Sequence, residues 1–266
     1  MNIKNGTLSL SGSTMDYIRF GRGDRVFVML PGLGDGLKNA AGMALPLAWM
    51  YRRFARDFRV LVLSRAVPLK DGSTTADMAE DVACALRQLG VERASVVGVS
   101  MGGMIAQWLA IDYPEKVNKL ILTVTCARPN PILTESVEEW IRLAKEGDAA
   151  GFMDSNLRRI YSDDYYRKNK WMVPLTGLLT RPKSYDRFLI MAEACRTHDA
   201  RTRLAQITAP TLVIGGEQDQ SLGGEASREI AAQIPGAQLK IYPQWGHGLY
   251  EEAKDFNQLV LDFLMK

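Results

Sequence analysis

The stretch Gly98-Val99-Ser100-Met101-Gly102-Gly103 joins two apolar segments through a serine flanked by glycines. Residues 94–99 are typical of a short buried strand, and residues 104–110 begin an amphipathic helix. A turn this tight has no room for a Cβ beside the serine, and the third glycine lets the helix approach the strand. The pattern G-x-S-x-G between a strand and a helix is the nucleophile elbow. We therefore expect Ser100 to be a nucleophile.

The chain has two histidines, so few residues can serve as its general base. His247 follows the apolar run Leu239–Tyr242 and lies between two glycines. A base that reaches a serine at the carboxyl end of a central strand should lie on such a loop after a strand. His198 lies in a polar helical stretch, where packing or capping near a helix end is the expected role and a pocket role the alternative.

A carboxylate that orients the histidine ring is expected after another strand. Asp219 lies in the loop that follows the apolar run Thr211–Gly215, and it is the best candidate. Glu217 is the alternative, but it is nearer the strand end and is expected to cap the turn. The loop after the predicted strand 119–125 contains no carboxylate, which also favours Asp219.

The chain order serine, acid, histidine is that of the α/β-hydrolases, and the sequence resembles this superfamily over nearly its full length. Residues 28–34 resemble the family's oxyanion loop after its third strand, although Pro31 stands where many relatives have histidine. The oxyanion donor is a backbone N–H, so this replacement does not remove it. The resemblance implies an oxyanion hole made by the N–H groups of Leu33 and Met101, and neither a metal nor an organic cofactor.

Strands and helices alternate at both ends of the chain, as a mostly parallel sheet requires. Thr74 and Asp77 predict a capping box for one of these helices. The resemblance implies an α/β fold with an eight-stranded, mostly parallel sheet and helices on both faces. No strand is evident between residues 129 and 199, where several helices are expected. We therefore expect a hydrolase core of residues 1–128 and 200–266, with a helical cap of residues 129–199 inserted after the sixth strand.

The composition fits one α/β domain with an insertion, since the chain has 266 residues and is 47% hydrophobic. It has neither an apolar run of membrane-spanning length nor an apolar signal core at its start, so we expect no membrane insertion and a cytoplasmic location. The net charge of +3 and the absence of a dense basic stripe argue against nucleic acid as a partner. Arg158 and Arg159 are expected to lie on a solvated helix face. A small-molecule substrate is expected, and the oligomeric state is left open.

This constellation predicts acyl transfer, in which His247 removes the Ser100 proton and Asp219 holds the imidazole. We expect hydrolysis of a carboxylic ester of small or medium size through an acyl-serine. The same residues would serve a serine-dependent C–C hydrolase, a perhydrolase or haloperoxidase, an enol-lactonase or a menaquinone-pathway lyase. Outside enzymes, the alternative is a ligand receptor or signalling regulator. Candidates for substrate contact are Asp35, Trp140, Leu222 and Leu249.

Overall fold

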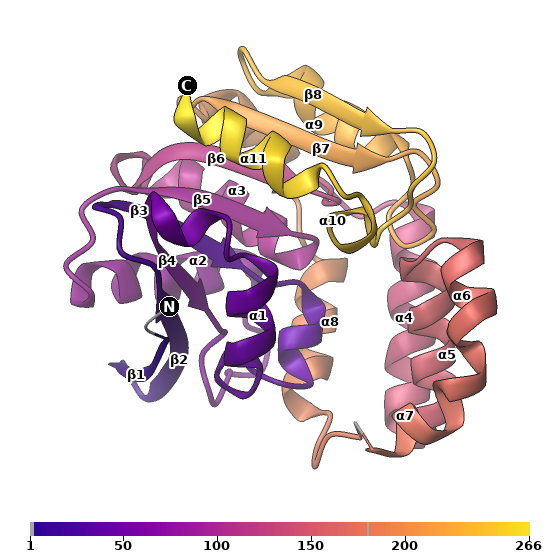
Figure 1. The fold of residues 1–266 in the computed structure, drawn as a ribbon. Helices are drawn as coiled ribbons and strands as arrows, with labels where there is room; N and C mark the ends of the chain where they lie inside the picture. Colours follow the sequence, from indigo (N-terminus) through magenta and orange to yellow (C-terminus); the bar gives the residue numbers. More distant parts are fainter. Residues whose placement is uncertain (1–2, 180) are drawn as a thin grey trace.

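Eight strands form one sheet in the order β1-β2-β4-β3-β5-β6-β7-β8 (Figure 1). This computed structural model describes residues 3–179 and 181–266. β2 runs antiparallel to both of its neighbours, and the pairs from β4 to β8 are parallel. The strands span β1 Lys4–Leu10, β2 Ser13–Phe20, β3 Arg25–Leu30, β4 Phe58–Leu63, β5 Ala94–Val99, β6 Val117–Thr123, β7 Thr211–Gly216 and β8 Gln238–Tyr242.

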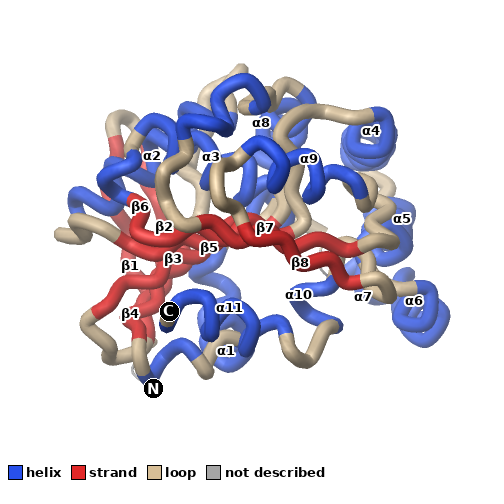
Figure 2. The backbone as a smooth tube through the Cα atoms, turned by 90° about the horizontal axis from the view of Figure 1, so that it is seen from above, coloured by secondary structure: helices blue, strands red, loops and turns tan. Residues whose placement is uncertain are grey.

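Helices cover both faces of the sheet, with α2, α3 and α9 on one face and α1 and α11 on the other (Figure 2). The predicted fold class is confirmed. The helices span α1 Ala44–Met50, α2 Thr75–Gln88, α3 Met101–Asp112, α4 Pro131–Glu146, α5 Ala149–Ile160, α6 Asp163–Asn169, α7 Val173–Leu179, α8 Asp186–Arg196, α9 Glu225–Gln233, α10 Leu249–Glu252 and α11 Phe256–Met265.

The alternation of side chains along each strand feeds two hydrophobic clusters, one on each face of the sheet. In β3, Val28 and Leu30 belong to the cluster under α2 and α3, whereas Phe27 and Met29 belong to the cluster under α1 and α11. All six residues of β5 are buried. Because β5 is central and covered on both faces, the turn that follows it is held by packing from two directions.

Between β6 and β7 the chain leaves the sheet and forms helices α4 to α8, which we call the helical insert. α4 begins at an Asn130 cap, whose side chain accepts a hydrogen bond from the Leu133 N–H, and ends at Gly147 with a φ of 70°. In Figure 1, α4 to α7 lie together beyond the arrowhead ends of β7 and β8. α8 packs against this group, because the Phe188 ring of α8 and the Phe152 ring of α5 meet edge-on with their centroids 5.1 Å apart. α8 packs closely on the turn after β3, because a Cβ at Gly36 would lie 2.9 Å from the Phe188 Cα. The division of the chain into a core and a cap stays a prediction.

Candidate active site

Ser100 occupies the strained turn that the glycine pattern predicts. It lies between β5 and α3 with a φ of 54° and a ψ of −122°, a conformation that costs a non-glycine residue about 1–3 kcal/mol. Its N–H donates to the Thr123 carbonyl at 2.9 Å. A Cβ at Gly98 would lie 2.4 Å from the Gly102 oxygen, and a Cβ at Gly102 would lie 2.0 Å from the Leu30 oxygen. The turn therefore requires both glycines.

His247 and Asp219 meet on neighbouring loops, after β8 and β7. The His247 Nδ1 and the Asp219 Oδ2 are 2.8 Å apart, and 6% and 4% of the two side chains are exposed. The other carboxylate oxygen of Asp219 accepts from the N–H groups of Ser221, at 2.8 Å, and Leu222, at 2.9 Å. The carboxylate is thus fixed on both oxygens and in turn fixes the imidazole ring. With Nδ1 engaged, Nε2 is the ring nitrogen left for proton transfer.

Two backbone N–H groups begin helices beside the serine. Leu33 is the first residue of the 3-10 turn Leu33–Gly36, and Met101 is the first residue of α3. A first helical residue has no partner for its N–H within the helix, so such groups are ready donors to an anion. The loop that carries Leu33 is close to Ser100, because a Cβ at Gly32 would lie 3.2 Å from the Ser100 Cβ.

Ser100 and His247 line the same cavity, which has a volume of about 380 Å³. Its walls come from the oxyanion loop, α1, α10 and the helical insert, and most of the lining side chains are apolar. The insert contributes Trp140 from α4, Asn156 and Ile160 from α5, and Phe188 from α8. A mainly apolar cavity with a few polar groups is typical of a small-molecule site.

Asp35 also lines this cavity, but its carboxylate is committed to two arginines. Its Oδ2 accepts from the Arg65 N–H at 2.8 Å and pairs with the Arg187 guanidinium, which also donates to the Asp35 carbonyl at 2.6 Å. The Arg65 guanidinium donates to the carbonyls of Pro31 and Leu63. Burial lowers the pKa of Arg65 to about 10, against the opposing effect of Asp35. This cluster holds the oxyanion loop to α8.

The four expected substrate contacts divide evenly. Asp35 and Trp140 line the cavity, whereas Leu222 and Leu249 do not. Leu222 is 2% exposed and packs in the cluster under α2 and α3, and Leu249 is fully buried in the cluster on the other face. The expectation for these two leucines was wrong, because each lies near a site loop but directs its side chain into the core. The backbone N–H of Leu222, by contrast, donates to the Asp219 carboxylate.

His198 lies away from the cavity and is 2% exposed. Its Nδ1 is 2.8 Å from the Thr75 Oγ1 at the start of α2, and its ring meets the Trp108 ring edge-on. Burial lowers the pKa of His198 to about 4, so the ring is neutral near pH 7. The other alternative, Glu217, pairs with Arg228 of α9 at 2.6 Å. Neither residue competes for the positions of His247 and Asp219.

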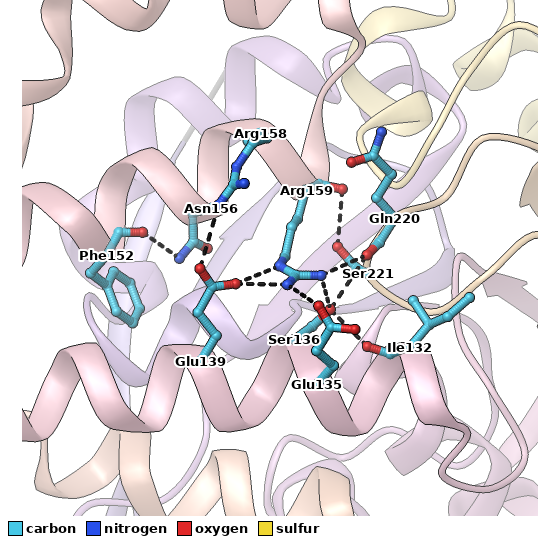
Figure 3. A network of polar contacts seen from close by, with 10 residues as sticks. All are labelled: Ile132, Glu135, Ser136, Glu139, Phe152, Asn156, Arg158, Arg159, Gln220 and Ser221. Carbon is cyan, nitrogen blue, oxygen red and sulfur yellow. Dashed lines mark hydrogen bonds and ion pairs between the residues drawn. The ribbon is translucent and has the colours of Figure 1, made fainter.

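Arg159 connects the helical insert to the loop that carries Asp219 (Figure 3). Its guanidinium pairs with Glu135 and Glu139 of α4 at 2.9 and 2.7 Å, and it donates to the Gln220 carbonyl. The Ser221 hydroxyl donates to the Arg159 carbonyl at 3.1 Å. Only 15% of the Arg159 side chain is exposed, so the expectation of a solvated face was wrong for this residue. The two acids four residues apart on α4 were the available signal.

Within the described ranges, no group of three or more histidine, cysteine, aspartate or glutamate side chains is arranged to hold a metal ion. No helix in the described part of the chain is long and apolar enough to cross a membrane.

Comparison with known proteins identifies the family. The sequence model of the alpha/beta hydrolase fold matches residues 25–254. The chain is similar to 2-hydroxy-6-oxononadienedioate/2-hydroxy-6-oxononatrienedioate hydrolases of Pseudomonas putida (29% identical, covering 98% of this chain and 94% of that protein) and Cupriavidus pinatubonensis (30%, covering 92% and 88%). In fold it is similar to an alpha/beta hydrolase from a Medee basin deep-sea metagenome library, with a TM-score of 0.85, 24% identity and 98% of each chain covered. Its relatives are hydrolases, so the protein is an enzyme and a hydrolase. The chain belongs to the alpha/beta hydrolase fold family.

Proposed function

We propose that this protein is a serine hydrolase that cleaves a carbon–carbon bond next to a ketone, with Ser100 as nucleophile, His247 as base and Asp219 as the residue that orients it. One observation carries the catalytic assignment. Ser100 lies on a strained elbow and shares its cavity with His247, whose Nδ1 is held 2.8 Å from Asp219. The N–H groups of Leu33 and Met101 are the proposed donors to the oxyanion.

The relatives favour carbon–carbon cleavage over the ester hydrolysis expected from the sequence. A 2-hydroxy-6-oxononadienedioate contains no ester or amide bond, so its hydrolysis must break a carbon–carbon bond. After the 2-hydroxy enol tautomerises to a ketone, a nucleophile can add to the 6-oxo carbon. The bond between C5 and C6 then breaks, and its electron pair is delocalised onto the oxygen at C2.

In this chain, the Ser100 Oγ would add to the 6-oxo carbon while its proton passes to the Nε2 of His247. The imidazolium would return that proton to the departing carbon chain as the C5–C6 bond breaks. A water molecule, deprotonated by His247, would then hydrolyse the acyl-serine and release a carboxylic acid. Across the cycle one water is consumed and no electrons are gained or lost.

The test compares the wild type with Ser100→Ala on two kinds of substrate. One is the 2-hydroxy-6-oxo-2,4-dienoate that ends in a methyl ketone, followed by the loss of its conjugated absorbance. The other is p-nitrophenyl acetate. We expect multiple turnovers of the dienoate, reduced about 10⁴- to 10⁶-fold in the folded variant. Turnover of the ester alone would support the ester hydrolase instead, and a single burst without turnover would support the receptor.

A further inference from the structure

The charges that line the cavity are few and nearly balanced. Apart from His247, the acidic and basic side chains in the described part of its wall are Asp35, Lys38 and Glu251. Asp35 is already paired with Arg187 and packed against Arg65. One cation and one carboxylate therefore remain to meet a substrate, and they come from different segments. Lys38 follows the oxyanion loop, whereas Glu251 belongs to α10.

Glu251 lies where α10, which follows the loop that carries His247, meets the helical insert. It lies four residues after His247, and its Oε2 accepts a hydrogen bond from the Tyr161 hydroxyl at 2.8 Å. Close by, the Gly248 N–H donates to the Ile160 carbonyl. No other donor to the Glu251 carboxylate is found among the described residues. Its Oε1 is therefore available to a ligand.

Two phenol groups, those of Tyr51 and Tyr250, line the same cavity as this carboxylate. Burial raises the pKa of both, and the charge of Glu251 raises them further. Tyr250 directly precedes Glu251 in α10 and Tyr51 directly follows α1, so these two segments supply the cavity wall with one carboxylate and two phenol groups.

We propose that Glu251, Tyr51 and Tyr250 form a specificity subsite that accepts a neutral or hydrogen-bond-donating end of the substrate and rejects a carboxylate at that end. The inference rests on the proposed function, since it concerns the substrate of the same site. Lys38 can neutralise one substrate carboxylate, whereas Glu251, the other acidic or basic side chain left without an ion pair in the described wall, would repel a second one. The dioate substrates of the relatives carry two carboxylates. This enzyme is therefore assigned a monocarboxylate whose far end is uncharged.

The experiment measures selectivity between two dienoates that differ at the far end. One is 2-hydroxy-6-oxonona-2,4-dienedioate, and the other is the 2-hydroxy-6-oxo-2,4-dienoate that ends in a methyl ketone. The wild type should prefer the methyl ketone in kcat/KM by about tenfold or more. In Glu251→Gln the preference should fall to within about threefold, through a lower KM for the dioate, because the repulsion acts on binding. The glutamine keeps an oxygen that can accept from Tyr161.

Glu252→Gln is the matched control. Glu252 is the neighbouring carboxylate on α10, and it accepts from the N–H and hydroxyl of Ser162, but it does not line the cavity. This variant should keep the wild-type selectivity even if its stability falls. A selectivity that shifts equally in both variants, or a wild type that prefers the dioate, would overturn the subsite.

The experiment distinguishes a failure of the proposed carbon–carbon hydrolysis from a failure of the proposed charge selectivity at Glu251. If neither dienoate is turned over but esters are, the proposed carbon–carbon hydrolysis is wrong. In that case the ratio of kcat/KM for the uncharged and the charged substrate is measured with p-nitrophenyl butyrate and the mono-p-nitrophenyl ester of succinate. Both rates are corrected for spontaneous hydrolysis. If the wild type prefers the uncharged butyrate ester and Glu251→Gln removes that preference, the subsite is still supported. If the wild type shows no such preference, the subsite is overturned. Loss of all turnover in the folded wild type would overturn both proposals.

Discussion

Asp35→Asn removes the one anion from a buried cluster that contains two cations. The Asp35 side chain is 1% exposed and the Arg187 side chain 16%, and Arg65 as a whole is 1% exposed. The asparagine amide keeps nearly the same shape and can still accept from the Arg65 N–H. The perturbation is therefore almost purely one of charge.

Asp35→Asn lowers the stability of the fold, because it leaves Arg65 and Arg187 without their anion. Removing one partner of a buried ion pair costs about 3–5 kcal/mol, because the remaining charge stays desolvated. Burial already lowers the pKa of Arg65 to about 10, and the loss of the Asp35 charge lowers it further. For a chain of this length, each kcal/mol lowers Tm by about 2–4 °C. We expect Asp35→Asn to lower Tm by roughly 6–20 °C.

Arg187→Met tests the same reasoning from the other side. It leaves one anion beside one buried cation, so it should cost about 1–2 kcal/mol, mainly through lost hydrogen bonds. Urea unfolding of both single variants and of the double variant, at one pH, gives the three free energies and their coupling. If Arg187→Met costs as much as Asp35→Asn, or if the two costs simply add, the charge balance of the cluster does not control stability.

Three further variants test the burial of His198 and the packing of the elbow. The pKa of His198 is about 4 in the fold and 6.5 in the unfolded chain, so the unfolded chain binds the proton first. The free energy of unfolding should therefore fall by up to about 3 kcal/mol as the pH falls from 6.5 to 4. In urea unfolding, His198→Asn should remove this pH dependence while keeping kcat within about tenfold. Gly102→Ala places a Cβ 2.0 Å from the Leu30 oxygen and should lower the free energy of unfolding by about 3 kcal/mol or more. Gly34→Ala has no atom within 4 Å of its Cβ and should lower it by under about 1 kcal/mol.

Local patterns predicted the parts of this protein that local geometry determines. The glycines around Ser100 predict a turn with no space for a Cβ, and the short distances that a Cβ at Gly98 or Gly102 would have to neighbouring backbone atoms confirm this steric reason. The capping box of Thr74 and Asp77 forms as expected, since its partners are three residues apart. His247 and Asp219 were placed together because loops at the carboxyl ends of neighbouring parallel strands must meet at one edge of the sheet.

Contacts between distant segments were not predictable in the same way. No local pattern relates Asp35 to Arg187, because that pair depends on how α8 docks against the turn after β3. The direction of the Leu222 side chain likewise depends on packing between layers, which hydrophobic periodicity does not report. The burial of Arg159 depends on two acids from another helix. Such long-range contacts shape the cavity, so substrate preference is the property that sequence patterns define least.

Labelling with a fluorophosphonate, followed by peptide mapping, shows whether Ser100 is an activated nucleophile, because the reagent modifies a serine that an adjacent base has activated. We expect one adduct per chain, on the peptide that contains Ser100. Ser100→Ala should abolish the adduct, and His247→Gln should slow its formation by at least about 100-fold, whereas His198→Asn should label at the wild-type rate. If Ser100→Ala is labelled as much as the wild type, or if His247→Gln is labelled as fast as the wild type, Ser100 is not a nucleophile activated by His247.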